Sequence, residues 1–188
     1  MELGFKKLTI DNWLEGDKTS DYFVWFSEEK QEFYKPSKEQ RVEVFLEPTL
    51  DDVVPEEVKR LFEVARGCLL YGHFFYPMYT LGLEQLYRVL ELAVTLKCTS
   101  INAPESINNF NKRIEYLIDN KIIPQSESIS WHATRRLRNY SSHPSGQTIL
   151  PPGEALRTLI MTTERINNLF GTEVDHGKAK ACNIDSSN

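Results

Sequence analysis

The chain lacks the features that mark membrane proteins, disulfide-stapled secreted proteins and zinc proteins. It has no apolar run of about 18 residues or more, the length that a membrane helix needs. Its first residues lack the apolar block of a signal peptide. Its three cysteines are an odd count without CxxC spacing, which argues against a zinc site or a disulfide framework. We therefore expect a reduced, cytoplasmic protein that stays out of the membrane and uses no metal and no cofactor.

Three common catalytic and nucleotide-binding motifs are also absent from the sequence. The GxxxxGK[ST] of phosphate loops, the GxSxG of serine hydrolases and the HExxH of zinc proteases do not occur. Apolar side chains, by contrast, are abundant, because 40% of the 188 residues are hydrophobic and 11% are aromatic. Such a composition suits one folded domain, alone or with an arm, and argues against a wholly disordered chain.

The net charge of −5 is unevenly distributed along the chain. Residues 1–57 contain 7 Lys and Arg against 15 Asp and Glu, whereas residues 58–123 contain 8 against 6 and residues 124–171 contain 5 against 3. The acidity therefore belongs to the N-terminal part, and the rest is mildly basic. This balance is compatible with RNA, although it gives no strong basic footprint.

From residue 55 onward, apolar side chains recur at helical spacing and predict an all-α fold. Five helices are expected, over about 55–71, 78–97, 102–118, 126–142 and 151–170. The second is apolar almost all round, which is typical of a central buried helix. Short connections favour an antiparallel bundle. We divide the chain into an acidic N-terminal arm (1–54), a helical bundle (55–171) and a flexible C-terminal tail (172–188).

Three local expectations concern the arm and the bundle. The alternating run 41–46 predicts a short strand, and the aromatic run 21–26 suits a strand or a docked helix turn. The arm is therefore expected to form a small hairpin or to pack on the bundle. The sequence at Asn102 resembles a capping box that opens the third helix. The fourth helix has an apolar stripe that we expect to face the core, formed by Ile129, Ala133, Leu137 and Tyr140.

The residues that suit catalysis gather at the end of the fourth predicted helix, where Arg138-Asn139 is followed by His143 and Pro144. Arginine forks onto phosphate oxygens, and the ordinary pKa of histidine, about 6.5, suits proton transfer near neutral pH. Pro144 ends the helix. Because Arg138 and His143 lie about 140° apart around an ideal helix, we expect two copies of the motif to form a shared cleft across a dimer axis.

This run resembles the motif of the HEPN superfamily, whose ribonucleases carry arginine, a polar residue and then histidine after four to six intervening residues. Arg138, Asn139 and His143 fill these places with four residues between the arginine and the histidine, and the resemblance covers about residues 55–171. It implies a helical homodimer that cleaves RNA without metal and leaves a 2′,3′-cyclic phosphate. In that scheme His143 moves the proton, Arg138 stabilises the phosphorane charge and Asn139 supports it. The resemblance also implies a toxin or phage-defence role, often with an antitoxin or other regulatory protein.

Three residues just before the motif are candidates for RNA binding. Arg135 shares a helix face with Arg138, and Arg136 follows it. Trp131 could stack on a base. The alternatives are a solvated basic face for the arginines and a core or interface position for the tryptophan.

Two carboxylates on the most apolar helix have two possible roles. Glu84 and Glu91 share a face, with Arg88 between them. Pairing with Arg88 is the simplest account, and the alternative is that they reach and orient Arg138.

Three functions follow from these observations. The first is a metal-independent endoribonuclease of HEPN type. The second is a non-catalytic module that binds RNA, a nucleotide or a partner protein. The third is an unrelated helical interaction protein, in which Arg138 makes a salt bridge and His143 merely ends a helix.

Overall fold

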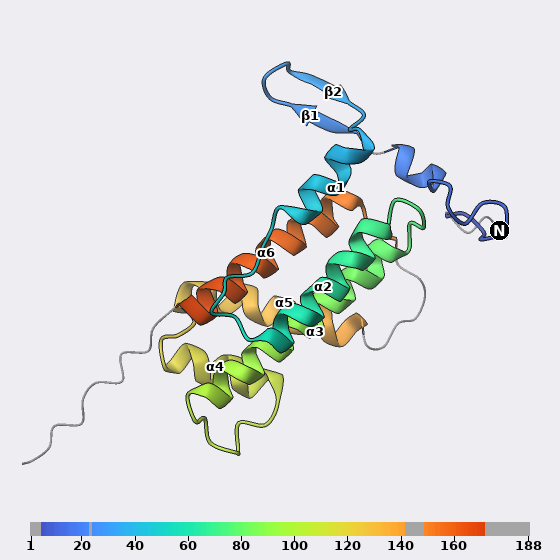
Figure 1. Cartoon of the computed structure of the whole chain (residues 1–188). Helices are drawn as coiled ribbons and strands as arrows, with labels where there is room; N and C mark the ends of the chain where they lie inside the picture. Colours follow the sequence, from blue (N-terminus) through green and yellow to red (C-terminus); the bar gives the residue numbers. More distant parts are fainter. Residues whose placement is uncertain (1–4, 23, 142–148, 172–188) are drawn as a thin grey trace, which may run out of the picture.

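The structure, a computed structural model, describes residues 5–22, 24–141 and 149–171. Within these ranges the chain is mostly helical, which confirms the predicted all-α class. The helices are α1 (Lys38–Leu46), α2 (Glu56–Tyr71), α3 (Met78–Ser100), α4 (Phe110–Asp119), α5 (Ser128–Ser141) and α6 (Pro152–Gly171), with 3₁₀ turns η1 (Lys18–Tyr22) and η2 (Gln125–Glu127). A two-stranded sheet, β1 (Trp25–Ser27) and β2 (Glu32–Tyr34), precedes α1 (Figure 1).

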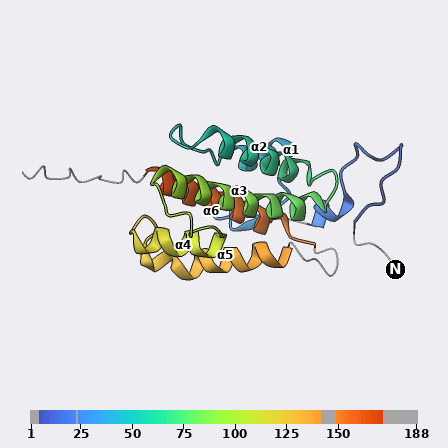
Figure 2. The ribbon, with the colours of Figure 1, turned by 90° about the horizontal axis from the view of Figure 1, so that it is seen from below.

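The helices form three layers, with α1 and α2 on one side, α3 and α6 in the middle, and α4 and α5 on the other side (Figure 2). α3 packs against α2, α4, α5 and α6. Its buried side chains include Leu86, Leu90 and Val94, so it is the central buried helix that its apolar sequence predicts. None of the helices in the described part of the chain combines the length and the apolar character that a membrane crossing needs.

The segment 41–46, expected as a strand, lies instead in the helix α1. The reason is a capping box: Ser37 Oγ accepts from the Gln40 backbone N–H at 3.1 Å, and the Ser37 N–H donates to Gln40 Oε1 at 2.8 Å. The helix then buries Phe45 against Tyr79, with ring centroids 6.1 Å apart. A helix from the segment assigned to the N-terminal arm thus contributes to the core of the bundle.

The arm does contain a short hairpin, but its second strand is 32–34 and not the expected 41–46. Strands β1 and β2 are antiparallel, with Trp25 opposite Tyr34. The hairpin projects beyond the bundle (Figure 1). The segment that precedes the hairpin contacts the connection between α2 and α3 through Asp17. Oδ2 of Asp17 accepts a hydrogen bond from the Tyr76 backbone N–H at 3.0 Å. Burial alone would raise the pKa of Asp17, but hydrogen bonds from the backbone of Tyr76, Thr19 and Lys6 outweigh it and lower that pKa.

Helix α4 begins later than the sequence predicts. Its N-cap is Asn109, whose Oδ1 accepts from the Lys112 backbone N–H at 3.0 Å. Asn102 adopts a left-handed conformation, with φ of 53°, just after the end of α3, so the capping box expected there is wrong. The late start leaves residues 102–109 as a loop beside α4.

Helix α5 turns its apolar stripe away from the core, which corrects the expected orientation. Ile129, Leu137 and Tyr140 are 81%, 51% and 67% exposed, whereas Trp131 and Thr134 are buried. Helical spacing reveals that an apolar face exists, but not what covers it. In this chain the buried face of α5 is the more polar one.

A buried arginine from α6 explains why the polar face of α5 can turn inward. Nη1 of Arg165 donates to Thr134 Oγ1 at 2.7 Å, and its guanidinium carbon lies 5.2 Å from the ring centre of Trp131. Trp131 Nε1 donates in turn to Glu127 Oε2 at 3.2 Å. These contacts give the polar groups partners on that face, so their burial is compensated.

Candidate functional site

Arg138 reaches from α5 across to α3, where it pairs with Glu91. Its Nη2 and Nε atoms lie 2.7 and 2.8 Å from Glu91 Oε2. The two side chains remain 34% and 26% exposed. Since two charge-assisted hydrogen bonds hold the planar guanidinium, Glu91 sets the orientation of Arg138 and leaves part of it open to solvent. The Nη1 atom lies 3.4 Å from Oδ1 of the neighbouring Asn139.

Of the two candidate carboxylates, only Glu91 belongs to this site. Glu84 lies seven residues earlier on α3, which is about 10 Å along the helix axis. Burial raises the pKa of Glu84, and nearby Arg88 partly offsets that effect. The two carboxylates therefore do not both pair with Arg88, because the carboxylate of Glu91 contacts Arg138 on α5.

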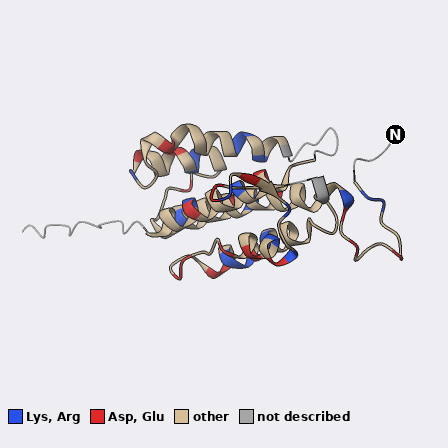
Figure 3. Ribbon diagram, turned by 90° about the horizontal axis from the view of Figure 1, so that it is seen from above, with Lys and Arg blue, Asp and Glu red and all other residues tan. Residues whose placement is uncertain are grey.

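Arg138 lines a hollow of about 350 Å³ where α3, α4 and α5 meet. The lining residues are Glu91, Asn108, Asn109, Phe110, Asn111, Arg113, Arg135, Arg138 and Asn139. Three arginines against one carboxylate give the hollow a formal charge of +2 in a chain whose net charge is −5. Figure 3 shows blue segments in the layer of α4 and α5, on the part of α5 nearest its C-terminal end. A cationic hollow with planar donors suits an oxyanion such as a phosphodiester.

Of the two predicted arginines, Arg135 shares the hollow of Arg138 and Arg136 does not. Arg135 lines the same hollow, and it also lines a second hollow between α4 and α5. Arg136 is exposed and lines only the second hollow, not the one that contains Arg138. The two residues therefore extend the cationic surface from Arg138 toward the N-terminal end of α5.

Trp131 does not serve as a stacking residue in this structure, which corrects its assignment to RNA binding. Its side chain is only 1% exposed, because it packs between helices with Arg165 against its ring. The core position that the sequence left open is the one found. His143 and Pro144 lie outside the described residues, as does the tail 172–188.

The sequence does not assign three further residues to the site, although the structure places them there. Arg113 lines the hollow and donates from Nη1 to Thr95 Oγ1 at 2.9 Å. Asn111 lies in the first turn of α4 and ends the run Asn-Asn-Phe-Asn of residues 108–111. His132 contacts Glu115 across the two helices, with Nε2 3.2 Å from Oε1. The run of asparagines near a helix start is the one sequence feature that points to Asn111. The contacts of Arg113 and His132 depend on how the helices pack, which the sequence does not show.

No family model, curated protein or solved structure matches this chain. Among the described residues, no three His, Cys, Asp or Glu side chains are grouped in a way that could hold a metal ion. The arrangement at Arg138 is therefore interpreted from its own chemistry.

Proposed function

We propose that this protein is a metal-independent endoribonuclease of HEPN type that acts as a homodimer. The observation that carries the proposal is the position of Arg138, which Glu91 orients at the wall of a cationic hollow. The same helix leads in sequence to His143, the proton-transfer residue of the motif. An oriented arginine beside an open, positively charged space is what a phosphoryl reaction needs for charge stabilisation.

The proposed reaction uses the RNA's own 2′-hydroxyl as the nucleophile. His143 removes the proton of the 2′-hydroxyl, the 2′ oxygen bonds to phosphorus, and the bond from phosphorus to the 5′ oxygen breaks. The departing 5′ oxygen takes up a proton from the second histidine of the dimer. The products are a 2′,3′-cyclic phosphate and a 5′-hydroxyl. Arg138 neutralises the charge that develops on the non-bridging oxygens, and Asn139 holds Arg138 from its other edge.

The exposed stripe on α5 supports a dimer. Ile129, Leu137 and Tyr140 are large apolar side chains on one face of the helix, and no other part of the described chain buries them. Burying such side chains contributes about 1.5–3 kcal/mol each. Because Leu137 adjoins Arg138 in the chain, a second copy that covers the stripe would lie next to the hollow.

A non-catalytic binding module is the alternative that one observation favours. Arg138 is already paired with Glu91, and such a pair also suits a helix contact or a passive anion site. A toxin or phage-defence role with an antitoxin or regulatory partner rests on the family resemblance alone.

The cleavage experiment uses labelled single-stranded and structured RNAs in EDTA, with the wild type, Arg138→Ala and His143→Ala. Arg157→Ala, an exposed arginine on α6, is the matched control. We expect cleavage with cyclic-phosphate ends by the wild type and the control only. Binding without cleavage by the wild type would favour the binding module, and equal cleavage by all four proteins would refute both assignments.

The dimer has its own test. Ile129→Glu places a charge in the exposed stripe, about two and a half helical turns before Arg138, and sedimentation measures the mass. A mass of two chains for the wild type and one for the variant is expected. A monomeric wild type at micromolar concentration would contradict the homodimer.

A further inference from the structure

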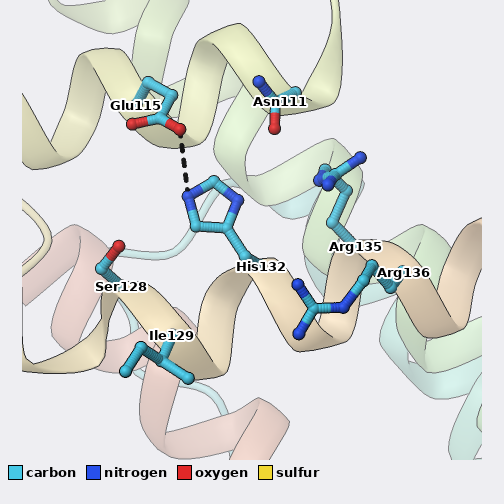
Figure 4. A pocket seen from close by; sticks show the side chains of 7 residues that line it. All are labelled: Asn111, Glu115, Ser128, Ile129, His132, Arg135 and Arg136. Carbon is cyan, nitrogen blue, oxygen red and sulfur yellow. Dashed lines mark ion pairs between the residues drawn. The ribbon is translucent and has the colours of Figure 1, made fainter.

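A second hollow of about 330 Å³ lies between α4 and α5, next to the one that holds Arg138. Its lining residues are Asn111, Glu115, Ser128, Ile129, His132, Arg135 and Arg136. Figure 4 shows Asn111 and Glu115 on one helix, facing His132 and Arg135 on the other. Asn111 and Arg135 also line the first hollow, so the two hollows adjoin, and together they are called the groove.

The groove contains cationic donors for which the described residues 5–22, 24–141 and 149–171 supply no partner. The guanidinium groups of Arg135 and Arg136 make no hydrogen bond or ion pair with any described residue, and the Nε atom of Arg135 is a buried donor without an acceptor. By contrast, Arg113, Arg138 and Arg165 all donate to side chains. A guanidinium with free donors is the strongest phosphate ligand that a protein side chain offers. Of the arginines on α4 and α5, the two that no described residue engages therefore line the groove.

The His132–Glu115 pair shapes one end of the groove. The contact at 3.2 Å holds the imidazole through Nε2, because a carboxylate oxygen accepts and the ring nitrogen donates. Figure 4 shows the ring between Glu115 and the side of the groove that carries Arg135. Since the Glu115 carboxylate repels anions, a phosphate is expected on the Arg135 and Arg136 side of the ring.

The dimensions suit a short stretch of nucleic acid strand. His132 and Arg138 are six residues apart on α5, about 9 Å along the helix axis. That length corresponds to two to three stacked nucleotides at about 3.4 Å each. Taken together, the two hollows carry four arginines against two carboxylates, a formal charge of +2 before any charge on His132.

We propose that the groove between α4 and α5 binds a phosphodiester adjacent to the one at Arg138, so that an RNA strand lies along α5. The placement of the second phosphate next to a cleavage site rests on the proposed function, whereas binding in the groove does not. Arg135 and Arg136 are the phosphate ligands, Asn111 is a neutral donor from the opposite wall, and none of the three takes part in the proton transfers.

The test measures binding of an uncleavable probe, a fluorescent 2′-deoxy oligonucleotide of about eight nucleotides, at several salt concentrations. Each phosphate contact on a single strand contributes about 0.7 to the slope of log K against log salt. The double variant Arg135→Gln/Arg136→Gln should therefore reduce the slope by about 1.4. At 0.1 M salt the same relation gives a loss of affinity of about 5-fold per contact, or about 25-fold for both.

Matched variants separate this effect from a general loss of charge or fold. Arg60→Gln/Arg157→Gln removes two exposed arginines outside the groove and should leave slope and affinity unchanged. Arg135→Lys/Arg136→Lys keeps the charge and should restore most of the slope. Circular dichroism melting checks that each variant is folded.

The outcomes distinguish the groove from the proposed enzyme. If the wild type cleaves no RNA but the groove variant binds the probe about 25-fold more weakly, the phosphate subsite stands and the enzyme proposal fails. Equal binding by the groove variant and its control would overturn the subsite, even if cleavage depends on Arg138. A wild type that does not bind the probe, or that binds polyglutamate of equal charge just as tightly through the same arginines, would also overturn it.

Discussion

Replacing Glu91 with glutamine tests the contact on which the candidate site depends. The substitution keeps the size of the side chain but removes the charge that holds the guanidinium of Arg138. The paired atoms lie 2.7 and 2.8 Å apart and belong to residues that are 47 positions apart in the chain, on two different helices. No local helix effect can therefore mimic the contact.

The magnitude follows from the partial burial of the pair. Exposed ion pairs contribute about 0.2–1 kcal/mol, and removing one partner of a fully buried pair costs about 3–5 kcal/mol. With side-chain exposures of 34% and 26%, we expect a coupling energy of about 1–2 kcal/mol between Glu91 and Arg138. For a chain of this size that corresponds to a change in Tm of roughly 2–8 °C.

Urea denaturation of the wild type, Glu91→Gln, Arg138→Gln and the double variant measures the coupling as a double-mutant cycle. Glu84→Gln on the same helix is the control, because burial raises the pKa of Glu84 and Glu84 forms none of the ion pairs found among the described residues. A coupling energy below about 0.3 kcal/mol, the scatter of independent sites, would refute the pairing. If the enzyme proposal holds, Glu91→Gln should also slow cleavage more than it weakens RNA binding, since Glu91 orients the arginine.

Two further predictions concern the scaffold. Asp17 has a lowered pKa, so its contribution to stability is present above the ordinary value of 3.8 and is lost as pH falls through the lower folded-state pKa. The stability difference between the wild type and Asp17→Asn in urea titrations should therefore shrink below about pH 4, and a difference that stays constant from pH 7 to pH 2 would contradict this. Gly82→Ala places a Cβ 2.5 Å from Leu69 Cδ2, which should lower the free energy of unfolding in urea by about 1–3 kcal/mol. A variant as stable as the wild type would show that α2 and α3 pack less closely than the structure describes.

Several parts of the fold could be predicted because they depend on neighbouring residues alone. The spacing of Val58, Phe62, Ala65 and Leu69 predicts α2, and all four are buried. The predicted start of α4 is wrong because Asn109, not Asn102, supplies the oxygen that caps the helix. Both asparagines have the right chemistry, and the sequence does not show which backbone conformation each adopts.

The candidate site was only partly predictable. Its arginines at 135, 136 and 138 follow from a run of basic residues near the end of one helix. Their partners come from other helices, so Glu91 remained one of two options and Glu115 gave no signal. The tryptophan of that run is buried, because Arg165 from α6 packs against its ring.

By itself, the sequence determined that the chain from residue 55 onward is mainly helical and where the cationic residues gather, since helix formation depends on spacing and capping within a few residues. Only the tertiary structure decided that Ile129 and Leu137 face outward, that Glu91 holds Arg138, and that α4 and α5 enclose a groove. These features depend on the angles and rotations at which helices pack. Side chains distant in sequence set those angles together.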